Sequence, residues 1–261
     1  MKIEWGAGKP RHRTSPSTWA QVRRWNAKAA ATGEFWPVFT ASLADVFDNE
    51  VPDEWRVDFW ALVRECPHLT FQMVTKRIGN VPRMLPPDWG DAGYPNVWLL
   101  ITVVNQEEAD RDIPKLLRVP ARIHGLSMEP LLGPVDLRMD AADVQVDEPG
   151  AANRRPRIDW VISGGESGED ARAPHLEWVR SLRDQCAAAG AAFFFKRWGE
   201  WRPADAAEAS APTARQAHSF ADGVISLKIG KKSSGRELDG RTWDQLPDTA
   251  GWAVEAAPAG V

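Results

Sequence analysis

Residues 97–104 read Val-Trp-Leu-Leu-Ile-Thr-Val-Val, and Asn105-Gln-Glu-Glu108 follows them directly. An apolar run of this length, without alternation of polar side chains, is typical of a parallel strand that is buried on both faces. Asn105 is a favourable N-cap, and acidic residues after it suit the first turn of a helix. The stretch therefore predicts a strand that leads into a helix over 106–118.

Apolar runs on both sides repeat this arrangement. We expect further strands at residues 36–42, 70–75, 122–127, 159–163 and 192–196, with helices at 52–66 and 175–189 among them. Alternation of six strands with helices is typical of an α/β fold, with a parallel sheet and helices outside it. Periodicity alone leaves two arrangements open, an incomplete barrel and an open, doubly wound sheet.

The length of 261 residues suits one large α/β domain. We expect it to span residues 1–247, with a basic N-terminal extension, a polar excursion at 140–157, a loose loop at 203–223 and a tail at 248–261. No apolar run approaches the ~20 residues that cross a bilayer. The first residues also lack the apolar segment of a signal peptide. We therefore expect a cytoplasmic protein without a membrane partner.

Polar residues gather where the predicted strands end, which is where parallel α/β folds bind ligands. Each one alone also fits a helix cap, a solvated loop or a structural ion pair. Burying several charges around one mouth costs several kcal/mol unless a ligand or a tight network compensates. We therefore expect a ligand pocket that is built from Ser42, Asp45, Lys76, Glu129, Gly164, Gly165, Glu166, Ser167 and Lys196.

The turn Gly164-Gly-Glu-Ser-Gly168 is the most distinctive of these segments. Glycines after a buried strand let the backbone approach a ligand, and free N–H groups there can hold a carboxylate or a phosphate. The turn matches neither the P-loop nor the dinucleotide fingerprint. A tight strand-to-helix connection is the plain alternative.

Two clusters of basic residues raise the question of a nucleic-acid partner. Residues 2–28 hold seven Lys or Arg against the single acid Glu4, and residues 228–236 hold four more. Such patches can contact phosphates. The net charge of −4, and the common role of charge runs as solvated surface, favour the opposite interpretation.

The two cysteines, Cys66 and Cys186, lie in apolar helical patterns, which favours buried free thiols. Two thiolates complete neither a Cys₄ zinc site nor the three-cysteine set of a typical enzyme cluster. We therefore expect no metal held by the protein.

Several segments occur together in an order that resembles one known family. Among them are Lys2-Ile-Glu-Trp5, Ser42-Leu-Ala-Asp-Val-Phe-Asp48, Ser127-Met-Glu-Pro-Leu-Leu-Gly-Pro134 and Phe193-Phe-Phe-Lys-Arg-Trp-Gly-Glu200. Over roughly residues 1–247 the chain resembles the phage gene-product thirty-seven/sixty-eight family, which has no settled reaction. The resemblance implies a partial (β/α)₆ TIM-like barrel of the radical S-adenosylmethionine type. It also implies S-adenosylmethionine as a candidate ligand at Ser42, Asp45 and Glu166.

The chain departs from that family in one segment. Relatives follow Lys-Ile-Glu-Trp with cysteines that end in Cys-x-x-Cys-Tyr-Ala, whereas Trp5 is followed here by Gly6-Ala-Gly-Lys-Pro10. In radical enzymes three thiolates hold the cluster that reduces S-adenosylmethionine. We therefore expect no iron–sulfur cluster, and the radical reaction does not carry over.

Three functions stay open. The first is a barrel that has lost the radical step but still binds a nucleotide or a nucleic-acid-related ligand. The second is a cluster-independent enzyme with Glu129 or Glu166 as acid and base, and with Lys76 or Lys196 stabilising negative charge. The third is an inactive deletion form of a phage-type radical enzyme.

Overall fold

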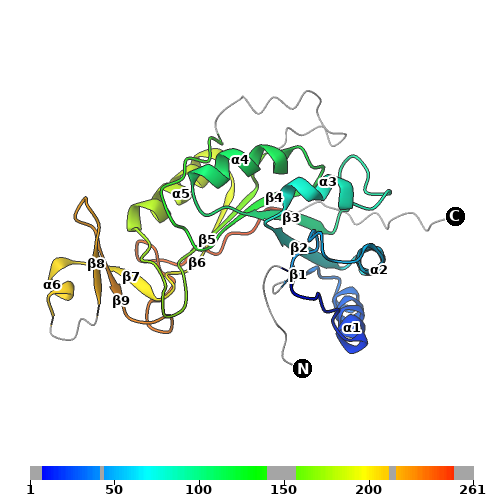
Figure 1. Ribbon diagram of the computed structural model, residues 1–261, viewed down its shortest axis with the longest axis horizontal. Coiled ribbons are helices and arrows are strands. Elements are labelled where there is room, and N and C mark those ends of the chain that lie inside the picture. The colour runs from blue at the N-terminus through cyan, green and yellow to red at the C-terminus, as the bar shows by residue number, and fades with distance from the viewer. Residues whose placement is uncertain (1–7, 42–43, 140–156, 212–215, 250–261) are drawn as a thin grey trace.

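The computed structural model describes residues 8–41, 44–139, 157–211 and 216–249. The protein has an α/β fold in which six parallel strands form a curled half-barrel flanked by helices (Figure 1). The strands are β1 (Trp36–Thr40), β2 (Leu69–Thr75), β3 (Val97–Thr102), β4 (Ile123–Met128), β5 (Trp160–Gly164) and β6 (Ala192–Arg197). Residues 140–156 of the expected excursion, and 250–261 of the expected tail, lie outside the described residues.

All six predicted strands are confirmed, and each pairs in parallel with the next strand of the chain. The sheet order is β1-β2-β3-β4-β5-β6, without a reversal. A doubly wound sheet needs a point at which the strand order reverses. The consecutive order therefore decides for the incomplete barrel over the doubly wound sheet.

Three helices follow the predicted boundaries closely: α2 (Asp53–Glu65), α4 (Gln106–Leu117) and α5 (Leu176–Ala189). Asn105 caps α4, because its side-chain oxygen accepts a hydrogen bond from the Glu108 N–H at 2.9 Å. The structure adds α1 (Pro16–Thr32), the short η1 (Ile78–Asn80) and α3 (Val81–Met84). Within the described part of the chain, no helix has the length and apolar character needed to cross a membrane.

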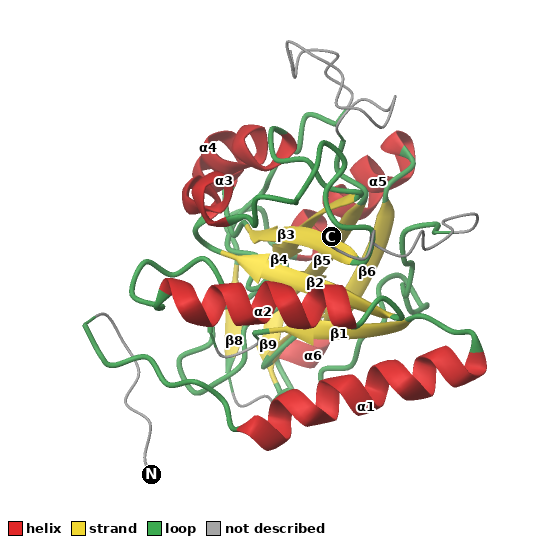
Figure 2. Cartoon of the chain, turned by 90° about the vertical axis from the view of Figure 1, so that its right-hand side faces the viewer, coloured by secondary structure: helices red, strands yellow, loops and turns green. Residues whose placement is uncertain are grey.

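The sheet carries a hydrophobic core on each face. The larger core lies between the sheet and its helices, where strand residues such as Phe71 and Leu99 pack with helix residues such as Val63 and Leu182. The smaller core lies on the opposite, inner face and is centred on Trp98. Burial on both faces explains why the strand sequences show no polar alternation. In Figure 2 the strands of the parallel sheet lie side by side, and the helices lie next to the sheet.

The outer edge of β6 is covered by a segment near the C-terminus. The Phe195 N–H donates to the Trp243 carbonyl at 2.8 Å, and the Gln245 N–H donates to the Phe193 carbonyl at 3.2 Å. The indole N–H of Trp160 also donates to the Gln245 carbonyl at 3.0 Å. This segment therefore satisfies backbone groups that an edge strand would otherwise expose.

Residues 203–223 differ from the expected loose loop, because parts of this segment form strands of a second, antiparallel sheet. Its order is β7-β9-β8, from β7 (Trp201–Ala204), β9 (Ile225–Lys228) and β8 (Ala217–Ser219), and α6 (Ala206–Ala209) follows β7. A capping box between Asp205 and Glu208 begins α6. The alanine-rich composition hides this sheet, since few large side chains mark its strands. Figure 1 shows it at one end of the arch.

We expect Leu99→Ala to lower the free energy of unfolding by about 2–5 kcal/mol, because it leaves a cavity in the larger core. Leu99 is 1% exposed, whereas Leu246, the control for a Leu→Ala change, is 54% exposed. Leu246→Ala should change the free energy by less than about 0.5 kcal/mol. Urea unfolding measures both. Equal effects of the two substitutions would contradict the assignment of β3 to the sheet centre.

Candidate functional site

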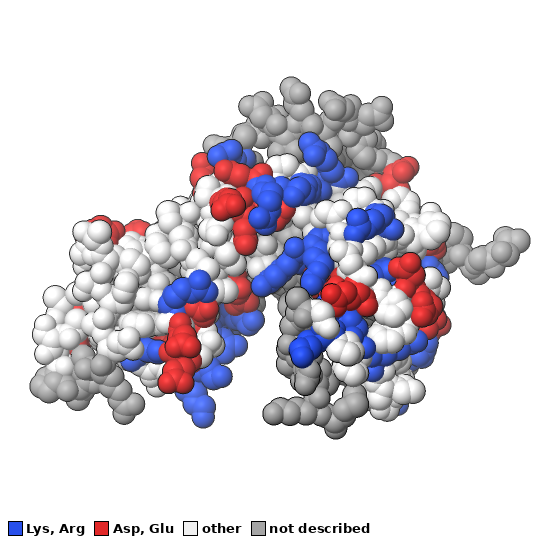
Figure 3. Space-filling view, in the orientation of Figure 1, with Lys and Arg blue, Asp and Glu red and all other residues white. Residues whose placement is uncertain are grey.

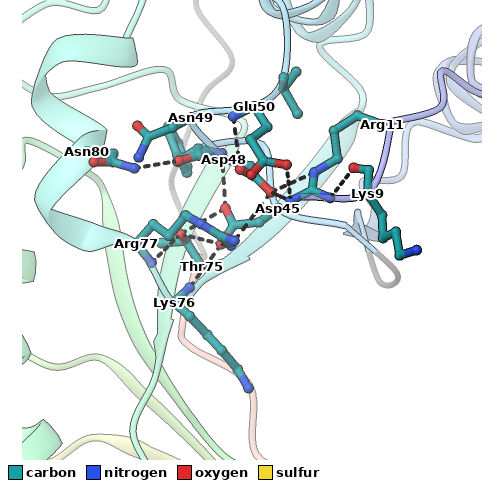
Figure 4. A network of polar contacts seen from close by, with 12 residues as sticks. Lys9, Arg11, Asp45, Asp48, Asn49, Glu50, Thr75, Lys76, Arg77 and Asn80 are labelled. Atoms are coloured by element: carbon teal, nitrogen blue, oxygen red, sulfur yellow. Dashed lines mark hydrogen bonds and ion pairs between the residues drawn. The ribbon is translucent and has the colours of Figure 1, made fainter. Parts of the chain in front are cut away.

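The first group of strand-end residues joins β1 to β2 through Asp45. Its carboxylate accepts hydrogen bonds from the Thr75 hydroxyl at 2.9 Å, the Lys76 N–H at 3.1 Å and the Arg77 guanidinium at 3.1 Å. The Asp45 side chain is 10% exposed. Figure 4 shows these donors converging on one carboxylate, while the Lys76 side chain extends away from it. Asp45 is therefore fully engaged by the protein itself.

Asp48 extends this network to the N-terminal extension. Its carboxylate accepts from Arg11 Nε at 3.0 Å and forms an ion pair with Arg77 at 3.3 Å. Burial opposes its charge, but the hydrogen bond from the Glu50 N–H and the charges of Arg77 and Arg11 hold the pKa of Asp48 below its ordinary value. Asp48 is therefore ionised at neutral pH and already neutralised by two arginines.

The second group lies at the ends of β4, β5 and β6. Lys196 Nζ donates to Glu129 Oε2 at 2.9 Å. Gly164 lies against the same carboxylate, since a Cβ atom there would stand 2.3 Å from Glu129 Oε1. A Cβ atom on Gly165 would stand 1.9 Å from the Trp198 carbonyl oxygen. The Trp198 backbone leaves no room for a side chain at Gly165, whereas the flexible Glu129 side chain beside Gly164 can move; the contact at Gly165 favours the tight connection over a ligand cradle.

Glu166 binds Arg172 rather than facing Glu129. Its two oxygens accept from Arg172 Nε at 2.8 Å and Nη2 at 2.7 Å, and the Arg172 N–H adds a third hydrogen bond at 2.8 Å. The side-chain hydrogen bond from Arg172 holds the pKa of Glu166 below its ordinary value, against the effect of burial. A carboxyl group in this state is a poor general acid at neutral pH. Ser167 is exposed beside it.

Glu200 is a member of the site that the sequence analysis missed. Its carboxylate accepts from the Gly168 N–H and the Lys231 N–H, each at 3.2 Å. Its own N–H donates to the Glu166 carbonyl at 2.8 Å. Glu200 therefore stabilises the turn after β5 and connects it through hydrogen bonds to the segment that follows the small sheet. The sequence signal for Glu200 is its place three residues after Arg197, at the end of the segment Phe193–Glu200.

The predicted site residues form two groups along one edge of the sheet. Strands lie about 4.8 Å apart, so the four steps from β2 to β6 span roughly 19 Å along the sheet. No hydrogen bond or ion pair joins the two groups among the described residues. Ser42 lies outside the described residues.

Four cationic side chains near these strand ends keep their charge unpaired. Lys76 and Arg197 are exposed, and so are Lys231 and Lys232. Their side chains form no ion pair with a described residue. In the N-terminal extension the arrangement differs, because acids already bind three of its arginines: Arg11 pairs with Asp48, Arg13 with Asp58 and Arg23 with Glu65.

The cysteines do not fit a cluster site. Cys66 directly follows α2 and precedes β2, and Cys186 lies in the last turn of α5 before β6. Both therefore lie toward the amino ends of the strands, opposite the two groups. Burial raises the pKa of Cys66 to about 11 and that of Cys186 to about 12, so both thiols are protonated at neutral pH. In residues 8–41, 44–139, 157–211 and 216–249, no three His, Cys, Asp or Glu side chains gather as a metal site.

We expect Asp45→Ala to lower the free energy of unfolding by roughly 2–3 kcal/mol, because several donors at the ends of β1 and β2 lose their acceptor. The control is Asp58→Ala, which removes an exposed ion pair with Arg13 and should cost less than about 1 kcal/mol. Denaturant unfolding compares the two variants. A loss no larger for Asp45 than for Asp58 would show that the network does not hold the strand ends.

We expect the Glu166–Arg172 pair to make stability depend on acid pH. Because its folded pKa is lowered, Glu166 contributes stability above its unfolded pKa of about 4.3, and this is lost as pH falls through the folded pKa. Arg172→Gln should therefore reduce the difference in unfolding free energy between neutral and strongly acid solution. Arg138→Gln, at an exposed pair with Asp110, serves as the control and should leave this difference nearly unchanged. If Arg172→Gln leaves the pH dependence of the unfolding free energy unaltered, the Glu166–Arg172 pair is not its source.

One family model matches the chain, over residues 1–247, and its description is "Protein of unknown function (DUF5131)". No curated protein matches the chain, and no solved structure matches it. The matched range includes both groups of strand-end residues and the small sheet.

Proposed function

The chain belongs to this family of unknown function, whose model covers residues 1–247, and we propose that it binds a phosphate-bearing ligand, a nucleotide or a nucleic acid. The proposed site lies along the carboxyl ends of the parallel strands. One observation carries the proposal: the strand-end carboxylates are bound by the protein's own donors, whereas the nearby exposed side chains of Lys76, Arg197, Lys231 and Lys232 form no ion pair with a described residue.

The balance of charge decides between an anionic and a cationic ligand. Asp45, Glu129 and Glu166 are neutralised by Arg77, Lys196 and Arg172, so a cationic ligand would have to break an existing ion pair. An anion can instead contact the exposed lysine and arginine side chains, which are solvated and form no ion pair with a described residue. Release of the counterions of a polyanion then favours binding.

The shape of the molecule supports the same proposal. Figure 3 shows a hollow between the end of the arch that carries the small sheet and the opposite end, with Lys and Arg side chains around it and some Asp and Glu side chains among them. A chain-like polyanion could contact several of these cations at once, whereas a mononucleotide would contact fewer.

We also propose that this half-barrel is a relative of the phage family and of radical S-adenosylmethionine barrels that has lost the radical step. Six consecutive parallel strands support the relationship, and Gly6-Ala-Gly-Lys-Pro10 stands where relatives carry their cysteines. The positions of Cys66 and Cys186 do not fit a cluster, so no step of the proposed function uses one. Engagement of Asp45 and Glu166 by arginines favours the anionic ligand over S-adenosylmethionine.

The Glu129–Lys196 pair supports a second candidate, a cluster-independent enzyme. The two side chains are 20% and 46% exposed and lie 2.9 Å apart, so a substrate could reach both. A carboxylate and an ammonium in this arrangement can exchange a proton with a substrate and stabilise negative charge that develops on it.

We expect Lys76→Ala and Arg197→Ala to weaken binding of a fluorescent oligothymidylate and to lower its salt dependence. Each cation that contacts a phosphate of a single strand should contribute about 0.7 to the magnitude of the negative slope of log K against log salt concentration. Fluorescence anisotropy at several salt concentrations measures this slope.

The matched control is Arg118→Ala. Arg118 is exposed, but it follows α4 and precedes β4, so it lies at the amino ends of the strands. Its loss should leave the slope unchanged. Equal effects of all three substitutions, or binding that does not respond to salt, would refute the proposed site.

A further inference from the structure

A cavity of about 420 Å³ opens between the start of α5 and the small sheet. Four aromatic side chains line it, together with two polar ones: Trp178, Trp201, His218, Phe220, Arg172 and Gln216. The volume is within the range of small-molecule sites, which bind mostly by apolar and aromatic contact. None of the residues predicted to form the site lines this cavity.

The aromatic rings form walls rather than a stack. His218 meets Phe220 with centroids 4.5 Å apart at 81°, and Trp201 meets His218 at 6.3 Å and 77°. Trp178 meets Phe220 at 5.7 Å and 71°. Because neighbouring rings of the lining are nearly perpendicular, they do not stack on one another, although His175 occupies one face of Trp178 and Lys228 Nζ lies over one face of Trp201.

Hydrogen bonds fix two of the lining side chains. The indole N–H of Trp201 donates to the Ala171 carbonyl at 2.7 Å. The guanidinium of Arg172 is held by both oxygens of Glu166. These contacts hold the two side chains in place before a ligand binds. The conformational entropy that the side chains lose on binding is therefore smaller.

The charge of the lining selects the class of ligand. Arg172 is the charged group among the described residues of the lining, which include no carboxylate. An aromatic cage for a cation gains from nearby negative charge, and the described lining supplies none, since Arg172 is already paired with Glu166. A neutral planar ring needs no such charge, and the Gln216 amide can both donate to its edge and accept from it.

Hydrogen bonds connect the lining of the cavity to the segment that carries one of the proposed phosphate-binding cations, Lys231. Glu200 binds the N–H groups of Gly168 and Lys231, and Arg172 binds Glu166 in the same turn. Lys231 and Arg172 therefore flank one braced turn. A ligand with a ring in the cavity could place a phosphate beside Lys231.

We propose that this cavity binds a nucleobase of the nucleotide or nucleic acid, through stacking on its aromatic walls. The inference rests on the proposed function and names the part of the ligand that this second site recognises. Base stacking on aromatic side chains tolerates every base, so the site should show little sequence preference.

The test compares two labelled ligands of equal length and phosphate number, an oligothymidylate and an abasic sugar-phosphate strand, by fluorescence anisotropy. The wild-type protein should bind the oligothymidylate about ten- to a hundredfold more tightly. Phe220→Ala and His218→Ala should remove most of this difference and leave binding of the abasic strand unchanged. His218 is exposed on the edge strand β8, so its substitution carries little risk to folding.

Trp25→Ala is the control, since Trp25 is an exposed aromatic residue on α1, and it should alter neither affinity. Thymidine monophosphate serves as a competitor that distinguishes a free nucleotide from a strand as the source of the base. Equal wild-type affinity for the two strands would overturn the base site while leaving the phosphate site intact. If the protein binds neither the oligothymidylate, nor the abasic strand, nor thymidine monophosphate, the proposed function itself is overturned.

Discussion

Burial of the central strands on both faces forces the charged groups of this sheet to its ends. A charge placed between the sheet and the helices, or on the inner face beside Trp98, would lose its water without gaining a partner. The carboxylates of Asp45, Glu129 and Glu166 therefore meet their cationic partners at the strand ends, each through a segment that follows a strand. The same constraint that builds the sheet thus places these three ion pairs at the carboxyl ends of its strands.

Much of the fold could be predicted because strand, cap and helix signals agree locally. The run at 97–104 and the cap at Asn105 are short-range features, and the structure keeps both. The small sheet could not be predicted in this way, because Ala217–Ser219 and its neighbours are exposed and carry no apolar period. This strand is stabilised by pairing with β9, and the sequence of one segment alone does not show which other segment it pairs with.

The positions of the candidate residues after the strands can be derived from the sequence, whereas the pairing of their side chains cannot. The strand-end positions are local properties, but partners such as Arg11 for Asp48 lie 37 residues apart. Nor does the sequence show that Glu166 turns toward Arg172 instead of Lys196. Pairing of side chains depends on curvature of the sheet and on loop conformation, and neither follows from spacing. The aromatic cavity escaped notice for the same reason, since its walls come from α5, β7, β8 and the residue after β8.

The segment that covers β6 has a consequence for the behaviour of the protein in concentrated solution. Residues 243–245 hydrogen-bond to the outer edge of β6. Among the described elements, β1 is therefore the edge strand of the half-barrel whose outer side pairs with no other strand. Pro37 lies within β1 and has no N–H with which to extend a ladder. One border of the sheet is thus closed by its own chain and the other is interrupted by a missing donor. Strand exchange between molecules, and the fibrous association that it seeds, is disfavoured at both borders.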